Sequence, residues 1–177
     1  MKRILVAVDL QNDFIDGSLG TPEARAIVPA AVRVIEGFDG LVFATLDTHD
    51  ERYPLTREGR LLPVPHCVKG TRGHEPAPPV MERLSAKGAV FVEKTSFGSA
   101  ELPELIARAA GGDPDEIELI GLCTDVCVVS NALLLKARFP EAEISVDASA
   151  CAGVTPALHE AALKTMASCQ ITIKNNE

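Results

Sequence analysis

Two cysteines lie four positions apart in the segment GLCTDVCVVS, residues 121–130. Cysteine can bind a metal, form a disulfide, fill an apolar core or act as a nucleophile, and the spacing alone leaves these roles open. A nucleophilic cysteine must form a thiolate, which the N-terminus of a helix and a nearby ammonium group both stabilise. We predict that Cys127 lies in the first turn of a helix, whereas Cys123 lies in the turn before it. Cys127 is therefore the better candidate nucleophile.

Two charged residues end other apolar segments of the chain. Asp9 ends ILVAVD, and Lys94 ends AVFVEK. Taken alone, an aspartate at such a position is more often a turn former, and a lysine is usually solvated. Together with Cys127, they would supply a proton acceptor and a cation to a nucleophile. Asp9 could take the thiol proton and later deliver it to a leaving amine.

A second group of residues has the types that bind divalent metals. Asp47 ends another apolar segment, His49 follows two positions later, and His66 lies further along the chain. Carboxylate and imidazole ligands suit zinc, iron or manganese, and we expect zinc first. Glu58 is a further candidate, either as a ligand or as an anchor for a metal-bound water. The plainer alternative is that His49 and His66 are ordinary loop residues, and we expect His74 to be a surface residue.

Six short apolar segments have the length of strands. Most are apolar on both faces, which is typical of buried parallel strands, while the last alternates as an edge strand would. They are ILVAVDL (4–10), LVFATLD (41–47), AVFVEK (89–94), IELIGL (117–122), EISVDAS (143–149) and QITIK (170–174).

Helical patterns occupy much of the sequence between these strands. Proline at the first helical position and glycine at the end support several of the boundaries. The predicted helices cover residues 22–36, 101–110, 125–138 and 156–168. This alternation predicts an α/β protein, a three-layer α/β/α sandwich with a mainly parallel sheet of five or six strands.

Residues 48–80 interrupt the alternation with a long connection rich in proline, glycine and charge. Connections of more than about 12–15 residues inside a compact domain are usually functional. In open α/β sheets, ligands bind beyond the carboxyl ends of the strands. We therefore expect the chemistry at that edge of the sheet, next to this connection.

Length and composition narrow the function classes. The chain has 177 residues and a net charge of −8, so we expect one domain over 1–177 and no nucleic-acid partner. No apolar stretch approaches the ~20 residues of a membrane span, and we expect a cytoplasmic protein. The odd number of cysteines suits a reducing compartment, with Cys151 and Cys169 as buried packing residues.

Four motifs in order resemble the isochorismatase-like cysteine hydrolases, and most closely their nicotinamidase branch. They are VDLQNDF (8–14), DTH (47–49) with LPVPHCVKGTRGHE (62–75), EKTSFGS (93–99) and GLCTDVCV (121–128). The resemblance spans almost the whole chain. It implies that the substrate is a small amide such as nicotinamide, and that the protein forms a homo-oligomer.

The resemblance also implies a role for each site residue. Cys127 would attack the amide carbonyl and form a thioester, with Asp9 as base and then acid and Lys94 balancing charge. The backbone N–H groups of Cys123 and Cys127 would form the oxyanion hole. The peptide bond between Leu122 and Cys123 would be cis.

The resemblance assigns the remaining site residues to the metal and the substrate ring. A metal ion held by Asp47, His49 and His66 would bind the ring nitrogen of the substrate, and Phe14 and Phe97 would contact the ring. Here the metal segment reads Asp-Thr-His-Asp, whereas the family often has tryptophan before the histidine and proline after it, and this chain has no tryptophan.

Three other functions remain open from the sequence. One is a metal-free relative that cleaves another C–N bond or a vinyl ether. Another is a redox or zinc-binding module built on Cys123 and Cys127, although the C-x3-C spacing lacks a second cysteine pair. The last is a non-catalytic protein on the same fold, against which the intact set of Asp9, Lys94 and Cys127 argues.

Overall fold

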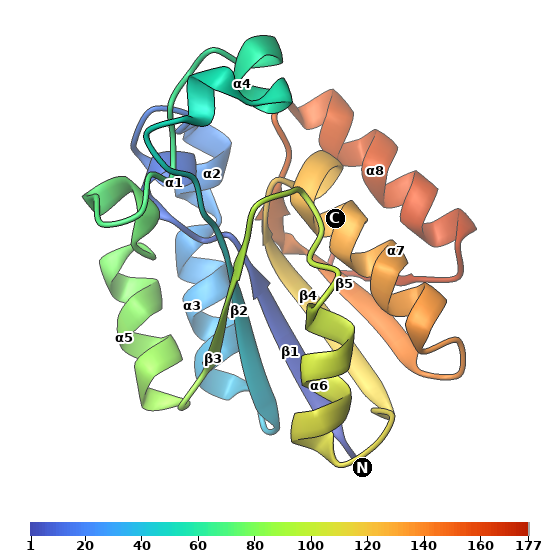
Figure 1. Cartoon of the computed structure of the whole chain (residues 1–177). Coiled ribbons are helices and arrows are strands. Elements are labelled where there is room, and N and C mark those ends of the chain that lie inside the picture. The colour runs from blue at the N-terminus through green and yellow to red at the C-terminus, as the bar shows by residue number, and fades with distance from the viewer. Residues whose placement is uncertain (177) are drawn as a thin grey trace.

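The computed structural model describes residues 1–176 and is built around one six-stranded sheet. The strand order is β3-β2-β1-β4-β5-β6, and every neighbouring pair is parallel (Figure 1). The strands are β1 (Arg3–Val8), β2 (Leu41–Asp47), β3 (Val90–Lys94), β4 (Glu116–Leu122), β5 (Glu143–Ala152) and β6 (Thr172–Lys174). The predicted α/β class and parallel sheet are therefore confirmed.

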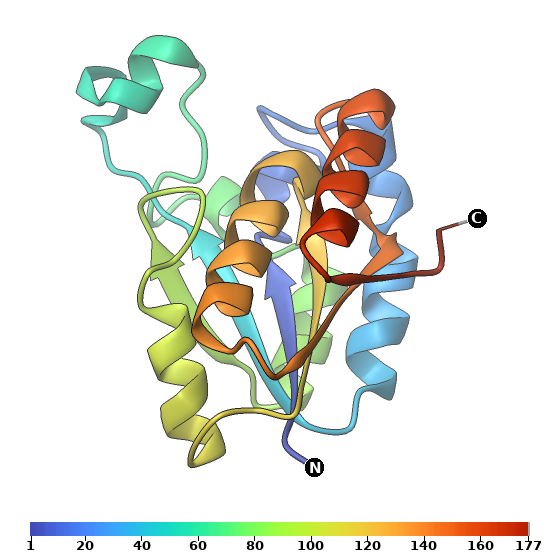
Figure 2. The ribbon, with the colours of Figure 1, turned by 90° about the vertical axis from the view of Figure 1, so that its right-hand side faces the viewer.

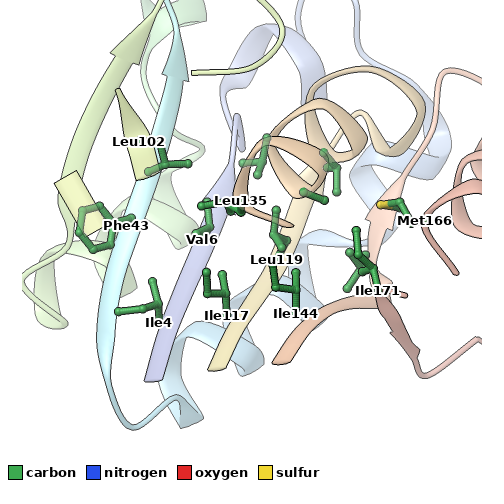
Figure 3. Packing of buried hydrophobic residues seen from close by; sticks show 14 of the residues in the cluster. Ile4, Val6, Phe43, Leu102, Ile117, Leu119, Leu135, Ile144, Met166 and Ile171 are labelled. Atoms are coloured by element: carbon green, nitrogen blue, oxygen red, sulfur yellow. The ribbon is translucent and has the colours of Figure 1, made fainter. Parts of the chain in front are cut away.

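Helices cover both faces of the sheet, as predicted for a three-layer sandwich (Figure 1). Alternate residues of β1 point to opposite faces, because side chains alternate along a strand. Val6 packs in the cluster with α6 (Leu102–Ala110), α7 (Val129–Arg138) and α8 (Pro156–Ser168) shown in Figure 3. Leu5 packs in the other cluster with α2 (Pro22–Ala26), α3 (Val28–Gly37) and α5 (Pro78–Ala86).

Local signals fix several helix boundaries as the sequence predicts. The side chain of Thr21 accepts a hydrogen bond from Ala24 N at the start of α2, and Thr155 caps α8 in the same way. The helix α6 ends at Gly111, whose φ of 64° lies in the left-handed region that glycine tolerates.

The predicted helix 22–36 is wrong in one respect, because the structure divides it into α2 and α3. Pro29 sits in the first turn of α3 and has no N–H to continue the hydrogen bonding of the preceding turn. The predicted helix 125–138 also differs in detail. It begins one residue earlier as a π-helix, η3 (Thr124–Val128), before α7 continues it.

The connection 48–80 has more secondary structure than predicted. It contains η1 (Tyr53–Leu55), α4 (Arg57–Leu61), η2 (Arg72–His74) and the first turn of α5. The side chain of Thr56 caps α4 by accepting a hydrogen bond from Gly59 N. The two short helices η1 and α4 form a folded segment that extends beyond the sheet (Figure 2). A short helix, α1 (Asn12–Ile15), also follows β1 without having been predicted.

The strand β3 differs from the expectation of a buried strand, because it lies at the edge of the sheet beside β2 only. Val90 and Phe91 are consequently exposed, at 44% and 39%. The strand β6 forms the other edge, as its alternating sequence predicts. Among the described residues, no helix is long and apolar enough to cross a membrane.

Candidate active site

The residues singled out in the sequence meet at the carboxyl edge of the sheet. Asp9 follows β1, Asp47 and Lys94 end β2 and β3 in register with each other, and Cys127 lies in η3 just after β4. Parallel strands place all these ends at one edge, which is where open α/β sheets bind ligands. Gly121 allows β4 to approach β1 there, because an added Cβ would lie 2.0 Å from Val8 O.

Asp9, Lys94 and Cys127 form one buried cluster. Lys94 Nζ lies 2.7 Å from Asp9 Oδ2 and donates a hydrogen bond to Cys127 Sγ at 3.6 Å. All three residues are nearly inaccessible, with exposed fractions of 0%, 4% and 4%. Thr45 Oγ1 donates to Asp9 Oδ1 at 2.7 Å, so both oxygens of this carboxylate face a donor or a cation.

Burial makes proton transfer, rather than a resting thiolate, the natural chemistry of this cluster. Burial raises the pKa of Cys127 well above its usual range, and the negative charge of Asp9 adds to this against the effect of Lys94. The charge of Lys94 lowers this pKa but does not outweigh burial, contrary to the expectation of a stabilised anion. Burial also raises the pKa of Asp9, which suits a carboxylate that accepts a proton from the thiol.

The predicted metal residues also converge. Asp47, His49, Glu58 and His66 each offer one ligand atom, and these four atoms lie within 4.8 Å of one another. Asp47 Oδ2 is 2.9 Å from His49 Nε2 and 3.3 Å from His66 Nε2. Glu58 Oε1 is 3.8 Å and 3.7 Å from the same two nitrogens.

These distances fit a metal ion. A tetrahedral zinc ion with bonds of about 2.0–2.1 Å would place its ligand atoms roughly 3.3–3.4 Å apart. His66 Nδ1 also lies 2.8 Å from the carbonyl oxygen of Val64, an arrangement that leaves Nε2 free to act as a ligand. The two oxygens and two nitrogens suit zinc, iron or manganese.

Asp47 belongs to both clusters. Its Oδ1 accepts a hydrogen bond from Lys94 Nζ at 3.3 Å, while its Oδ2 faces His49 and His66. Burial opposes ionisation of this carboxyl group, but hydrogen bonds to the two histidines and the charge of Lys94 hold its pKa well below its usual range. The carboxylate therefore joins the candidate metal cluster to the cluster of Asp9, Lys94 and Cys127.

The predicted substrate contacts are only partly assembled. Phe14 is buried, with its ring centroid 5.5 Å from that of His66, whereas Phe97 is 47% exposed on the loop after Lys94. The peptide bond between Leu122 and Cys123 is cis, as expected. The Cys123 thiol is half-buried, and burial raises its pKa to about 12. All five cysteines are free.

Two predictions about single residues are wrong. His74 is buried rather than at the surface, since η2 turns it inward and its Nε2 lies 2.9 Å from Thr48 Oγ1. That hydroxyl donates to Leu46 O, so it accepts from the His74 ring. Cys169 is exposed at the end of α8, while Cys151 is buried as expected.

Sequence reasoning missed several residues that hold the site in place. Gln11 is fully buried and pairs with the backbone of Asp47 in both directions, with distances of 2.8 Å to its N and its O. Tyr53, which the sequence offered only as a further aromatic wall of the substrate site, packs on the metal cluster instead, with its ring centroid 4.6 Å from that of His49 and 5.0 Å from that of His66. Thr45 was missed as well, although a polar residue in the otherwise apolar strand β2 was an available signal for it.

A cavity of about 930 Å³ lies next to the metal cluster. Its lining combines His49 and Glu58 with apolar side chains of the η1–α4 segment and with the loop after β3, which includes Phe97. Cys127 is not part of this lining, so the cavity adjoins the site from the metal side. The residues that line it are Thr48, His49, Asp50, Arg52, Tyr53, Leu55, Thr56, Arg57, Glu58, Leu61, Leu62, Lys69, Thr95, Ser96 and Phe97.

Fold and site together define an α/β protein with a buried cysteine, aspartate and lysine beside a candidate metal-ligand cluster. The sequence matches the family described as the Isochorismatase domain over residues 3–177. The chain belongs to the isochorismatase family.

Relatives of known structure share the whole architecture. The chain is 33% identical over 144 residues to the isochorismatase family protein PncA of Bacillus subtilis, covering 75% of this chain and 78% of that one. The crystal structure of nicotinamidase/pyrazinamidase PncA from Bacillus subtilis superposes with a TM-score of 0.85 at 31% identity, covering 99% and 100% of the chains. The crystal structure of the pyrazinamidase of Pyrococcus horikoshii in complex with zinc superposes with a TM-score of 0.82 at 29% identity, covering 98% of each chain.

Proposed function

We propose that this protein is a metal-containing cysteine amidohydrolase that converts nicotinamide, or a closely similar small aromatic carboxamide, to the carboxylic acid and ammonia. The observation that carries the proposal is the buried contact of Lys94 with both Asp9 and Cys127, directly beside a four-residue metal cluster. Relatives described as nicotinamidase/pyrazinamidase support the same substrate class.

The acylation step begins with the protonated thiol. Asp9 accepts the proton of Cys127 as Sγ attacks the amide carbonyl carbon, and Lys94 offsets the negative charge that gathers in the cluster. The tetrahedral intermediate carries its charge on the former carbonyl oxygen, where the N–H groups of Cys123 and Cys127 stabilise it. In other hydrolases the loss of one such donor costs about 2.7–4 kcal/mol.

The intermediate then collapses to products. Asp9 returns its proton to the amide nitrogen, and the C–N bond breaks. Ammonia departs, and the acyl group remains bound to Cys127 as a thioester. Water attacks the thioester carbonyl while Asp9 again takes a proton, and the released thiolate recovers that proton as the acid departs. The balance of the two half-reactions is one amide and one water consumed for one acid and one ammonia.

The metal cluster would serve substrate orientation. Asp47, His49 and His66 would hold the ion, with Glu58 as a fourth ligand or as the anchor of a bound water. Bound there, a divalent ion would supply an electrophile for the ring nitrogen of a pyridine carboxamide. Asp47 would also keep Lys94 oriented through its second oxygen.

Ammonia release from a panel of small amides tests the proposal. We expect nicotinamide and pyrazinamide to be hydrolysed, and hydrolysis to fall after treatment with a chelator. Hydrolysis of C–N bonds by protein that contains no divalent ion would instead favour the metal-free alternative. A fully metallated protein that releases no ammonia from any carboxamide would contradict the proposal.

A further inference from the structure

Asn131 is a fully buried polar residue that the mechanism above does not use. It lies in α7, four positions after Cys127, with an exposed fraction of 0%. Its Nδ2 donates to the carbonyl oxygen of Cys127 at 2.8 Å and to that of Phe97 at 3.3 Å. Its Oδ1 accepts from the backbone N–H of Ser99 at 3.0 Å.

This amide has only one orientation that satisfies its neighbours. A flip would place Nδ2 against the N–H of Ser99 and Oδ1 against two carbonyl oxygens, so that donors would face donors. Asn131 therefore binds the helix that carries the nucleophile and the loop that follows Lys94 at the same time.

That loop also holds the Lys94 side chain. The carbonyl oxygen of Ser96 accepts a hydrogen bond from Lys94 Nζ at 3.1 Å, and the same nitrogen contacts Cys127 Sγ at 3.6 Å. The contacts form a closed ring from the Cys127 backbone through Asn131, the loop and Lys94 back to the Cys127 sulfur.

A second observation places the loop tightly against α7. A Cβ added at Gly98 would lie 2.7 Å from Leu134 Cδ1 and 3.3 Å from Ser130 Cβ, so the loop backbone rests on the helix. Thr95, Ser96 and Phe97 themselves are exposed. The loop is thus anchored at its Ser99 end rather than packed along its length.

We propose that Asn131 is a positioning residue that clamps the 95–99 loop to the nucleophile helix and thereby sets the place of the Lys94 ammonium beside the Cys127 sulfur. The kinetic consequence rests on the proposed function, whereas the clamp itself does not. Misplacement of a reacting group by about 1 Å can cost roughly 100-fold in rate.

The substitution Asn131→Ser separates the two halves of the clamp. A serine hydroxyl in a helix can bond to the carbonyl four residues earlier, so the Cys127 contact is kept, but it is too short to reach the loop. The matched control is Ser130→Ala, the neighbouring residue, whose Oγ donates to Val126 O at 2.6 Å and makes no hydrogen bond to the loop.

Kinetics and hydrogen exchange give separate readouts. In Asn131→Ser we expect kcat to fall roughly 10- to 100-fold with KM and metal content little changed, and Ser130→Ala to match the wild type. We expect the Ser99 amide to exchange slowly in the wild type, like the interior of α7, and at least about tenfold faster in Asn131→Ser, since that variant leaves this amide without its acceptor.

Each outcome decides a distinct point. If Asn131→Ser retains wild-type kcat, or if Ser99 exchanges as fast as an exposed loop in the wild type, the clamp is wrong. If the wild type releases no ammonia at all, the proposed function fails, and the exchange measurement alone decides the clamp. If the variant does not fold, the exchange rate of the Ser99 amide in the wild type decides whether the clamp exists.

Discussion

The nucleophile assignment rests on contacts that Cys127 has and Cys123 lacks. Lys94 bonds to the Cys127 sulfur, whereas the Cys123 sulfur makes no hydrogen bond to a described residue. We expect Cys127→Ala to abolish ammonia release and Cys123→Ala to lower it only mildly, because the backbone N–H of residue 123 is retained. Steady-state assays of the two variants at equal metal content provide the check, and an equal loss in both would contradict the assignment.

The hydroxyl of Thr45 is one of several groups that affect the pKa of Asp9, after burial, Lys94 and Asp47. Its hydrogen bond lowers the pKa of a carboxyl group whose pKa burial otherwise raises. The substitution Thr45→Val should therefore raise that pKa and move the acid limb of the kcat/KM profile to higher pH, because the ionised carboxylate is the base. Loss of a buried hydrogen-bond partner should also cost about 1–3 kcal/mol of stability.

Thr45→Ser serves as the control for that substitution, since it keeps the hydroxyl and removes one methyl group. An acid limb at the same pH in wild type, Thr45→Ser and Thr45→Val would show that Asp9 is not the group that titrates.

At the scale of elements, the approach of β4 to β1 depends on Gly121. Its φ of 121° and the 2.0 Å separation between an added Cβ and Val8 O leave no room for a side chain. We expect Gly121→Ala to destabilise the protein by about 3 kcal/mol or more, from backbone strain and overpacking together. Gly37→Ala has no atom within 4 Å of the new Cβ and should be neutral or stabilising in urea unfolding.

The contact between α8 and the nucleophile turn predicts a pH effect on stability. Burial lowers the pKa of His159, whose Nδ1 lies 2.8 Å from Thr124 Oγ1, and it lowers the pKa of His74 as well. The unfolded chain binds protons at these histidines more readily, with a pKa of about 6.5. The contribution of these two histidines to stability should therefore fall as the pH drops through and below about 6.5, whereas the raised pKa of His66 acts in the opposite direction.

The substitution His159→Asn keeps a hydrogen-bonding group near Thr124 and removes the titration. Unfolding free energies between pH 7.5 and 5 should then fall less steeply than in the wild type. A slope unchanged by His159→Asn would show that another group is responsible.

The elements also show which features local sequence patterns can predict and which they cannot. Buried strands and proline-capped helices such as α8 depend on local periodicity and caps, so they were predictable. The exposure of β3 was not, because it depends on which strand lies at the edge of the sheet. The register that pairs Asp47 with Lys94 likewise joins residues 47 positions apart, and the burial of His74 depends on where η2 packs.

At the scale of the whole molecule, the candidate metal cluster joins a residue of the η1–α4 segment to a residue of the sheet. Asp47 ends β2, while Glu58 belongs to α4. A ligand that binds only the folded state stabilises it by about 2.7 kcal/mol at 100 times its Kd. Zinc should therefore raise the Tm of chelator-treated protein.

The variant Asp47→Asn should lose this response, and Asp50→Asn should keep it, since Asp50 is an exposed carboxylate outside the cluster that pairs with Arg52. Thermal unfolding with and without added zinc compares them. If added zinc does not change the Tm of the wild type, a structural link through this cluster is ruled out.

The thioester on Cys127 is the central claim, and it can be observed directly. Protein mixed with nicotinamide and quenched in acid during turnover should carry a nicotinoyl group on the peptide that contains residue 127, as read by mass spectrometry. The adduct should be absent from Cys127→Ala and unaffected in Cys123→Ala. Turnover without any acyl adduct, or an adduct on another residue, would contradict the account.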